Sequence, residues 1–253
     1  EFNKFTLSFS PDLENKFLKD YFKSSVGLLR ISFLLGALYY SFFAFLDVLV
    51  LPEMKQELFY VRFVIVVPVI LLVFLLSFTR NFNKWWQLAA IIATIVAGIG
   101  IVVMTVITPE LGRQSYYPGI MLVLFYCYML IRLRFIWASL SGWIIFIGYL
   151  ISTSVFPGVA KDIVTTNLFF LSSANILGMF GSYSLEYYAR RDFYSRHLLN
   201  KERKKVESAN EKLEEKVREK TKDLVKDIQH RKHVEKKLRV AINKAEEADQ
   251  LKS

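Results

Sequence analysis

Residues 59–86 read FYVRFVIVVPVILLVFLLSFTRNFNKWW, and this stretch decides how the chain folds. Positions 59–78 are almost entirely apolar, with Arg62 as the one charged residue. About 20 such residues are what a helix needs to cross a hydrocarbon core of about 30 Å. Arg80 and Lys84 follow directly, as cations do at the cytoplasmic end of a span. The stretch therefore predicts a transmembrane helix that ends at the cytoplasm.

Five further stretches show the same pattern. The predicted spans are 25–50, 59–78, 85–107, 116–131, 135–156 and 165–187, of which the fourth is the shortest. Cations flank the ends that would lie in the cytoplasm: Lys16, Lys19, Lys23, Arg80, Lys84, Arg132, Arg134, Arg190, Arg191 and Arg196. We therefore expect an all-α membrane protein with both termini cytoplasmic. Residues 1–23 would be an N-terminal segment and 24–188 a six-helix transmembrane bundle.

Charge is concentrated after the last span. Residues 189–253 hold 20 of the 33 Lys and Arg and 13 of the 23 Asp and Glu. The single cysteine, Cys127, excludes an intramolecular disulfide and a thiol metal cluster, and we expect it to fill the apolar interior. The N-terminus lacks the pattern of a removable signal peptide.

Two ladders of small residues predict close helix packing. They are Ala89, Ala93 and Ala97 in the third span, and Ala174, Gly178 and Ser182 in the sixth. The ladder in the sixth span fits either packing inside one chain or a dimer interface.

Charged residues inside predicted spans are candidates for functional sites, and Arg30, Asp47 and Arg62 are such residues in the first two spans. Arg30 is near enough to the cytoplasm for its long stem to reach the headgroups. Asp47 lies near the outer end of the first span, and Arg62 lies one turn into the second span from the same side. Their matching depths predict an Asp47–Arg62 ion pair.

Polar and aromatic residues gather at the same outer level. Tyrosines there fit an aromatic belt at the membrane interface, or a small polar and aromatic cavity that opens outward and holds a small amphiphilic ligand. The candidate residues around the pair are Tyr39, Tyr40, Glu110, Arg113, Tyr116, Tyr117, Asp162 and Asn167.

A long helix should follow the last span, because residues 182–253 contain neither Gly nor Pro. One heptad frame places Leu199, Val206, Asn210, Leu213, Val217, Leu224, Val234, Leu238, Ala241 and Ala245 on a single seam. Arg203, Lys220, Asp227 and Arg231 interrupt that seam with charge. The pattern predicts a parallel, dimeric, marginally stable coiled coil over 189–253 that can carry a signal; a passive spacer is the alternative.

No catalytic, cofactor or metal site is expected in this chain. The chain has no Gly-rich phosphate loop and no Ser-His-Asp arrangement, and His197, His230 and His233 lack ligand spacing. Acidic residues alternate with the cations of the tail, which fits coiled-coil flanks rather than nucleic-acid binding. The predicted partners are a second copy of the chain, membrane lipids and a small amphiphilic ligand.

The stretch LEEKVREKTKDLVKDIQHRKHVEKKLRVAINKAEEADQLKS, residues 213–253, resembles the signalling helix that leads into sensor histidine kinases, often hybrid ones. The segments 59–86 and EYYARRDFYSRHLLNKE, residues 186–202, resemble the six-span module found ahead of histidine kinases and class III adenylate cyclases. The box with the phosphorylated histidine, which follows this helix in the family, is not within the sequence. None of the three histidines is therefore assigned that role.

The resemblance implies the receptor and transmission part of a two-component sensor kinase, a homodimer whose kinase domain, and through it a response regulator, lies beyond Ser253. The first alternative is the same receptor module regulating a nucleotidyl or diguanylate cyclase. The second is a small transporter or channel, for which we find no inverted repeat and only Pro68 as a candidate helix break.

Overall fold

The computed structural model describes residues 2–4, 6–156 and 160–250, with side chains described over the same residues except 110–115 and 243–250. The described chain is helical apart from its turns, the N-terminal segment and an isolated antiparallel bridge between Asn3 and Ser8. It forms two compact units, residues 1–194 and 195–253.

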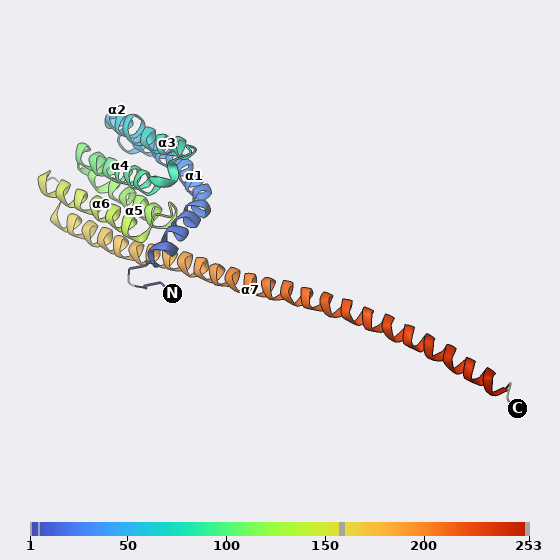
Figure 1. Cartoon of the computed structure of the whole chain (residues 1–253). Helices are drawn as coiled ribbons and strands as arrows, with labels where there is room; N and C mark the ends of the chain where they lie inside the picture. Colours follow the sequence, from blue (N-terminus) through green and yellow to red (C-terminus); the bar gives the residue numbers. More distant parts are fainter. Residues whose placement is uncertain (1, 5, 157–159, 251–253) are drawn as a thin grey trace. The chain divides into compact units, whose positions relative to one another are not determined.

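Helices occur at every predicted span (Figure 1). The elements are α1 (Pro11–Val50), η1 (Pro52–Met54), α2 (Lys55–Phe59), η2 (Tyr60–Val66), α3 (Val67–Leu76), η3 (Phe82–Lys84), α4 (Trp86–Ile107), α5 (Glu110–Met129), α6 (Phe135–Val155) and α7 (Lys161–Gln250). In the described part of the chain, five stretches are long and apolar enough to cross a membrane: Pro11–Val50, Pro52–Leu76, Trp86–Ile107, Phe135–Val155 and Lys161–Ile242. Tyr116–Met129 is a shorter apolar helix.

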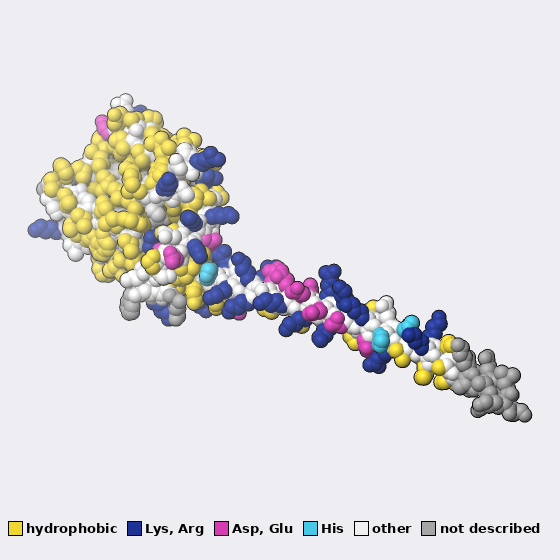
Figure 2. All heavy atoms as spheres, in the orientation of Figure 1, with side chains coloured by type: hydrophobic (Ala, Val, Ile, Leu, Met, Phe, Trp, Pro, Cys, Tyr) yellow, Lys and Arg dark blue, Asp and Glu magenta, His cyan; other side chains and the backbone are white. Residues whose placement is uncertain are grey.

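The outer surface of the first unit is apolar, as Figure 2 shows. Phe42 and Leu177 are each 71% exposed, and many other large apolar side chains face outward. Such a continuous apolar surface marks contact with lipid, and helices satisfy their own backbone hydrogen bonds there. The fold is that of an all-α membrane protein.

Helix α4 lies at the centre of the bundle and contacts α3, η2, α5 and α6. Its small residues Ala89, Ala93 and Ala97 are all buried, as the predicted ladder requires. In α7, a Cβ atom added at Gly178 would overlap the ring of Tyr128 on α5. This close approach supports packing inside one chain as the role of the α7 ladder.

The second span is not a regular α-helix. Tyr60–Val66 forms a π-helical segment directly before Pro68, which has no N–H group to donate back along the helix. A π-helical turn accommodates such a gap in the hydrogen-bond ladder, and these turns are frequent at functional sites. Arg62 lies within the π segment, and only 2% of it is exposed.

Arg30 contacts the end of α3. Its Nε donates to Ser77 Oγ at 3.1 Å, and its Nη2 donates to the Ser77 carbonyl at 2.7 Å. The last carbonyls of a helix lack partners within it and attract a nearby cation.

Helical structure continues without a break from Lys161 to Gln250, and over 182–250 this is what the absence of Gly and Pro predicted. In the second unit, every side chain described up to Ile242 is exposed. Leu213 and Leu238 on the predicted seam are each 60% exposed. Two charges that interrupt the seam pair with each other, since Arg231 Nε donates to Asp227 Oδ2 at 3.0 Å. Ala245 lies outside the described side chains.

Candidate functional site

The predicted ion pair between Asp47 and Arg62 is present. Arg62 Nε donates to Asp47 Oδ2 at 2.9 Å, and Nη2 donates to Oδ1 at 2.9 Å, which makes a bidentate contact. The two side chains are only 4% and 3% exposed. Asp47 comes from the last turn of α1 and Arg62 from the π segment η2. The pair therefore ties the first span to the second without leaving net charge in the interior.

Further groups complete the shell around the pair. Arg62 Nη1 donates to the Tyr40 carbonyl at 2.8 Å, and its guanidinium lies 4.9 Å from the centre of the Tyr40 ring. The Tyr116 hydroxyl donates to Asp47 Oδ1, and Met104 Sδ lies 3.7 Å from Arg62 Nη2. α1, η2, α4 and α5 thus all meet at this pair.

A cavity of about 570 Å³ adjoins the pair. Ligand pockets typically enclose about 300–1,000 Å³. Its wall is mostly apolar and includes four of the predicted site residues, Tyr39, Tyr40, Arg62 and Tyr116. The expected small polar cavity is thus replaced by a large apolar one, because the Tyr40 and Tyr116 hydroxyls are turned into bonds with protein acceptors.

Other predicted residues lie away from this cavity. Asn167 is buried on α7 and donates from Nδ2 to the Tyr149 hydroxyl at 3.0 Å. Tyr117 and Asn167 are not among the residues that line the cavity. Adjacent residues on a helix point about 100° apart, so Tyr116 and Tyr117 cannot both face α1. Asp162 is exposed, and Glu110 and Arg113 lie outside the described side chains.

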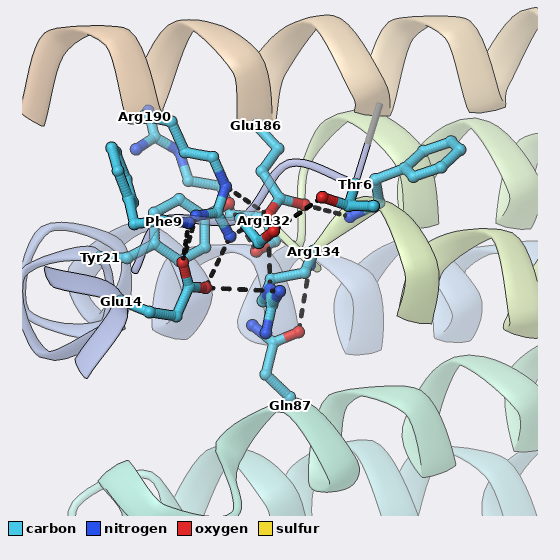
Figure 3. Close-up of polar contacts among 11 residues, drawn as sticks. Thr6, Phe9, Glu14, Tyr21, Gln87, Arg132, Arg134, Glu186 and Arg190 are labelled. Atoms are coloured by element: carbon cyan, nitrogen blue, oxygen red, sulfur yellow. Dashed lines mark hydrogen bonds and ion pairs between the residues drawn. The ribbon is translucent and has the colours of Figure 1, made fainter. Parts of the chain in front are cut away.

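A second buried charge cluster lies where α7 leaves the apolar part of the first unit (Figure 3). Arg190, with no exposed side-chain surface, donates from Nη1 and Nη2 to the Glu14 carboxylate at 2.7 and 2.9 Å. Its Nη2 also donates to Glu186 Oε1 at 2.7 Å. Arg134 lies 3.4 Å from Glu186 and 3.7 Å from Glu14. Two carboxylates and two guanidinium groups thus neutralise each other.

The cluster joins three distant parts of the sequence. Glu14 belongs to the first turn of α1, Arg134 precedes α6, and Glu186 and Arg190 belong to α7. Glu186 also accepts the backbone N–H of Phe135 at 2.7 Å. From the sequence, Arg190 was predicted only to be a cation that flanks the last span. Glu186 and Arg190 are four residues apart on one helix face, and this spacing could have indicated their ion pair.

The ion pairs in the cluster shift the pKa values of its members. Burial raises the pKa of Glu14, but hydrogen bonds from Arg190 and the Phe9 N–H, with the charges of Arg190 and Arg134, outweigh burial and leave it lowered. Burial lowers the pKa of Arg190, yet Glu14 and Glu186 raise it overall. Both groups are therefore held in their charged forms.

A protein-family model named MASE8 matches residues 45–200, which is more than half of the chain. The chain belongs to the MASE8 family. This is a family of membrane-associated sensor domains, so the protein is a membrane sensor. Comparison with curated proteins gave no match, and neither did comparison with solved structures.

The MASE8 match includes residues of both charge clusters. It includes Asp47 and Arg62 at one end of the bundle and Glu186 and Arg190 at the other. Glu14 lies before the matched region and pairs with it through Arg190. Within the described side chains, no group of three or more His, Cys, Asp or Glu could hold a metal ion.

We predict that the Asp47–Arg62 pair is a stabilising unit of the MASE8 domain. Asp47→Asn leaves a buried, unpaired guanidinium and should reduce the free energy of unfolding by about 3–5 kcal/mol. The double variant Asp47→Asn/Arg62→Met should recover part of this loss, because no unpaired charge remains. Thermal unfolding of the chain in lipid nanodiscs measures both effects. Losses that simply add in the double variant would contradict the prediction.

A second prediction concerns the pH dependence of the Glu14 contact. Because the folded state lowers the pKa of Glu14, its contribution to stability is present above the ordinary carboxylate pKa and is lost as pH falls through the lowered value. Glu14→Gln should therefore unfold at a lower temperature than the wild type at pH 7, and the difference should shrink below about pH 4. The exposed Glu53→Gln serves as control. A difference that stays constant over this range would refute the assignment.

Proposed function

We propose that this MASE8 chain is the receptor and transmission part of a two-component sensor histidine kinase. A ligand or a change in the membrane would act on the bundle, and α7 would pass the change to a kinase domain following Ser253. The observation that carries the proposal is the continuity of α7. One helix holds buried bundle residues such as Asn175 and Arg190 and continues into an exposed apolar heptad seam.

The kinase part of the proposal is supported by the resemblance of residues 213–253 to the signalling helix of sensor histidine kinases. A heptad seam interrupted by charge has only modest stability, so two packing states can lie within a few kcal/mol of each other. An equilibrium of this kind is what a signal must bias in order to be transmitted.

The proposed topology has six spans in the bacterial inner membrane, with both termini in the cytoplasm. The distribution of Lys and Arg supports this orientation, since the cations in the 79–84 and 132–134 turns and after residue 189 fall on one side. The shorter apolar helix Tyr116–Met129 would be the fourth span.

The proposed active form is a parallel homodimer joined along the α7 seam. Leu213→Cys and Leu238→Cys should therefore each form disulfide-linked dimers on mild oxidation in membranes, because equivalent core positions lie opposite each other in a parallel coiled coil. Glu215→Cys and Lys236→Cys, on the outer face of the same helix, are the matched controls. Separation on non-reducing gels gives the measurement. Equal crosslinking at seam and outer positions would rule out this dimer.

The function itself is tested by adding a dimeric histidine-kinase core in heptad phase after Ser253. We expect transfer of phosphate from ATP to the histidine of the added core. An insertion of seven residues before Lys220 keeps the heptad phase and should change the basal rate by less than about twofold, whereas an insertion of four shifts the phase and should change it at least about threefold. A rate insensitive to phase would refute transmission through this helix.

The same insertions made ahead of a class III cyclase core address the alternative output. Phase-dependent synthesis of cyclic nucleotide, together with a kinase fusion that ignores phase, would replace the kinase proposal with the cyclase one. The two fusions share the receptor, so the comparison isolates the output that α7 can regulate.

A further inference from the structure

The cavity beside the Asp47–Arg62 pair is a groove between α1 and α5. One lip is a stripe on α1 with exposed Leu35, Tyr39 and Leu46, and the other lip is a stripe on α5 with exposed Leu122 and Phe125. The base comes from α3 and α4 and is formed by the buried residues Ile70, Ala93, Thr94, Ala97 and Ile101. Because both lips belong to the apolar outer surface, the groove opens toward lipid.

The groove is long. Its residues on α1 run from Phe33 to Val50, which corresponds to about 26 Å at 1.5 Å per residue. Those on α5 run from Tyr116 to Tyr126, about 15 Å, and Leu130 and Ile131, just after α5, extend the lining further. A hydrocarbon core is about 30 Å thick, so the groove follows most of the depth of one bilayer. This shape suits an extended chain lying parallel to the helices.

Only a few polar atoms of the groove remain available to an occupant. Among the described residues, Thr94, Tyr116 and Tyr126 direct their hydroxyls to protein acceptors. The contacts of Arg62 with Asp47, Tyr40 and Met104 use four of its five N–H groups, and Arg62 also forms a hydrogen bond with the Tyr116 hydroxyl. Of these groups, that leaves the hydroxyl of Tyr39, on the lip of the groove, as a donor available to an occupant.

The charge of the site selects against an ionic occupant. Among the residues whose side chains are described, Arg62 is the only charged one in the wall of the groove, and Asp47 already neutralises it. A ligand with a full charge would be buried without a counter-charge, which is costly in apolar surroundings. An occupant with a small uncharged head that accepts hydrogen bonds would satisfy the remaining donor, the Tyr39 hydroxyl.

We propose that this groove binds an uncharged, single-chain amphiphile that enters sideways from the bilayer. Its chain lies along Phe33, Leu122 and Phe125, and its hydroxyl or carbonyl oxygen accepts from the Tyr39 hydroxyl. A transmembrane helix of a second copy fits less well, because its carbonyls are already bonded within the helix and offer this donor no acceptor. The inference names the ligand class for the receptor function proposed above and rests on it.

Binding is measured on the 253-residue chain in phosphatidylcholine nanodiscs, with no output domain attached. The probe is radiolabelled 1-dodecanoylglycerol, and empty nanodiscs give the background. We expect saturable binding, competed by unlabelled 1-dodecanoylglycerol and at least about tenfold less well by dodecanoate at pH 9. Because no signalling is measured, failure here overturns the ligand class and leaves transmission through α7 to its own test.

Substitutions on the lips locate the site. Leu122→Trp places a large ring over the groove and should weaken binding at least about tenfold, since it displaces part of the buried chain. Leu35→Trp does the same from the opposite lip, and it replaces Leu122→Trp in the experiment if that variant folds poorly. Ile147→Trp on α6, which is similarly exposed at 48% and lies outside the groove, should stay within about twofold of the wild type.

A conservative substitution at Tyr39 tests the contact with the polar head of the ligand. Tyr39→Phe keeps the ring and removes the donor, so it should weaken binding of 1-dodecanoylglycerol about two- to tenfold and leave competition by dodecane unchanged. Two results would overturn the proposal. One is probe binding no greater than in empty nanodiscs, and the other is equal binding by the Leu122→Trp, Leu35→Trp and Ile147→Trp variants. A second chain in the groove would also overturn the proposal. It would be shown by a disulfide between Leu35→Cys of one copy and Leu122→Cys of another, together with loss of probe binding.

Discussion

The bundle depends on the neutralisation of every charge that its described interior contains. Asp47 and Arg62 form a bidentate pair that is almost wholly buried, and at the other end Arg190 and the three charged groups around it neutralise each other. An ion without its partner in such surroundings costs several kcal/mol. Each helix that supplies one of these groups must therefore lie where its partner lies, so the two clusters fix the helices at both levels of the bundle.

The cavity follows from the same constraint. The contact between Asp47 and Arg62 holds α1 against the second span, and α4 holds α5 and α6 through close packing. α1 and α5 then meet mainly through long side chains such as Tyr116 and Tyr126, and an apolar groove remains between them. The π segment before Pro68 contributes by turning Arg62 inward. A signal that occupies this groove would act directly on the pair that positions α1.

Helix α7 runs from the first unit into the second. Its buried part carries Glu186 and Arg190, which bind Glu14 of α1 and face Arg134 ahead of α6. Any rearrangement that moves α1 must therefore either carry α7 with it or break buried ion pairs. For this membrane sensor of the MASE8 family, the coupling supports the proposed transmission from the bundle to the exposed part of α7.

The sequence alone determined the helical spans, the uninterrupted α7 and the Asp47–Arg62 pair, because hydrophobic length, missing Gly and Pro, and matching depth are local properties. Only the tertiary structure decided that Tyr116 rather than Tyr117 contacts the Asp47–Arg62 pair and that Asn167 binds Tyr149. It also decided that Arg190 lies buried at the centre of a second charge cluster. These outcomes depend on how each helix is rotated and which neighbour it meets. In lipid, where most faces of a helix are equally apolar, periodicity carries little information about that rotation.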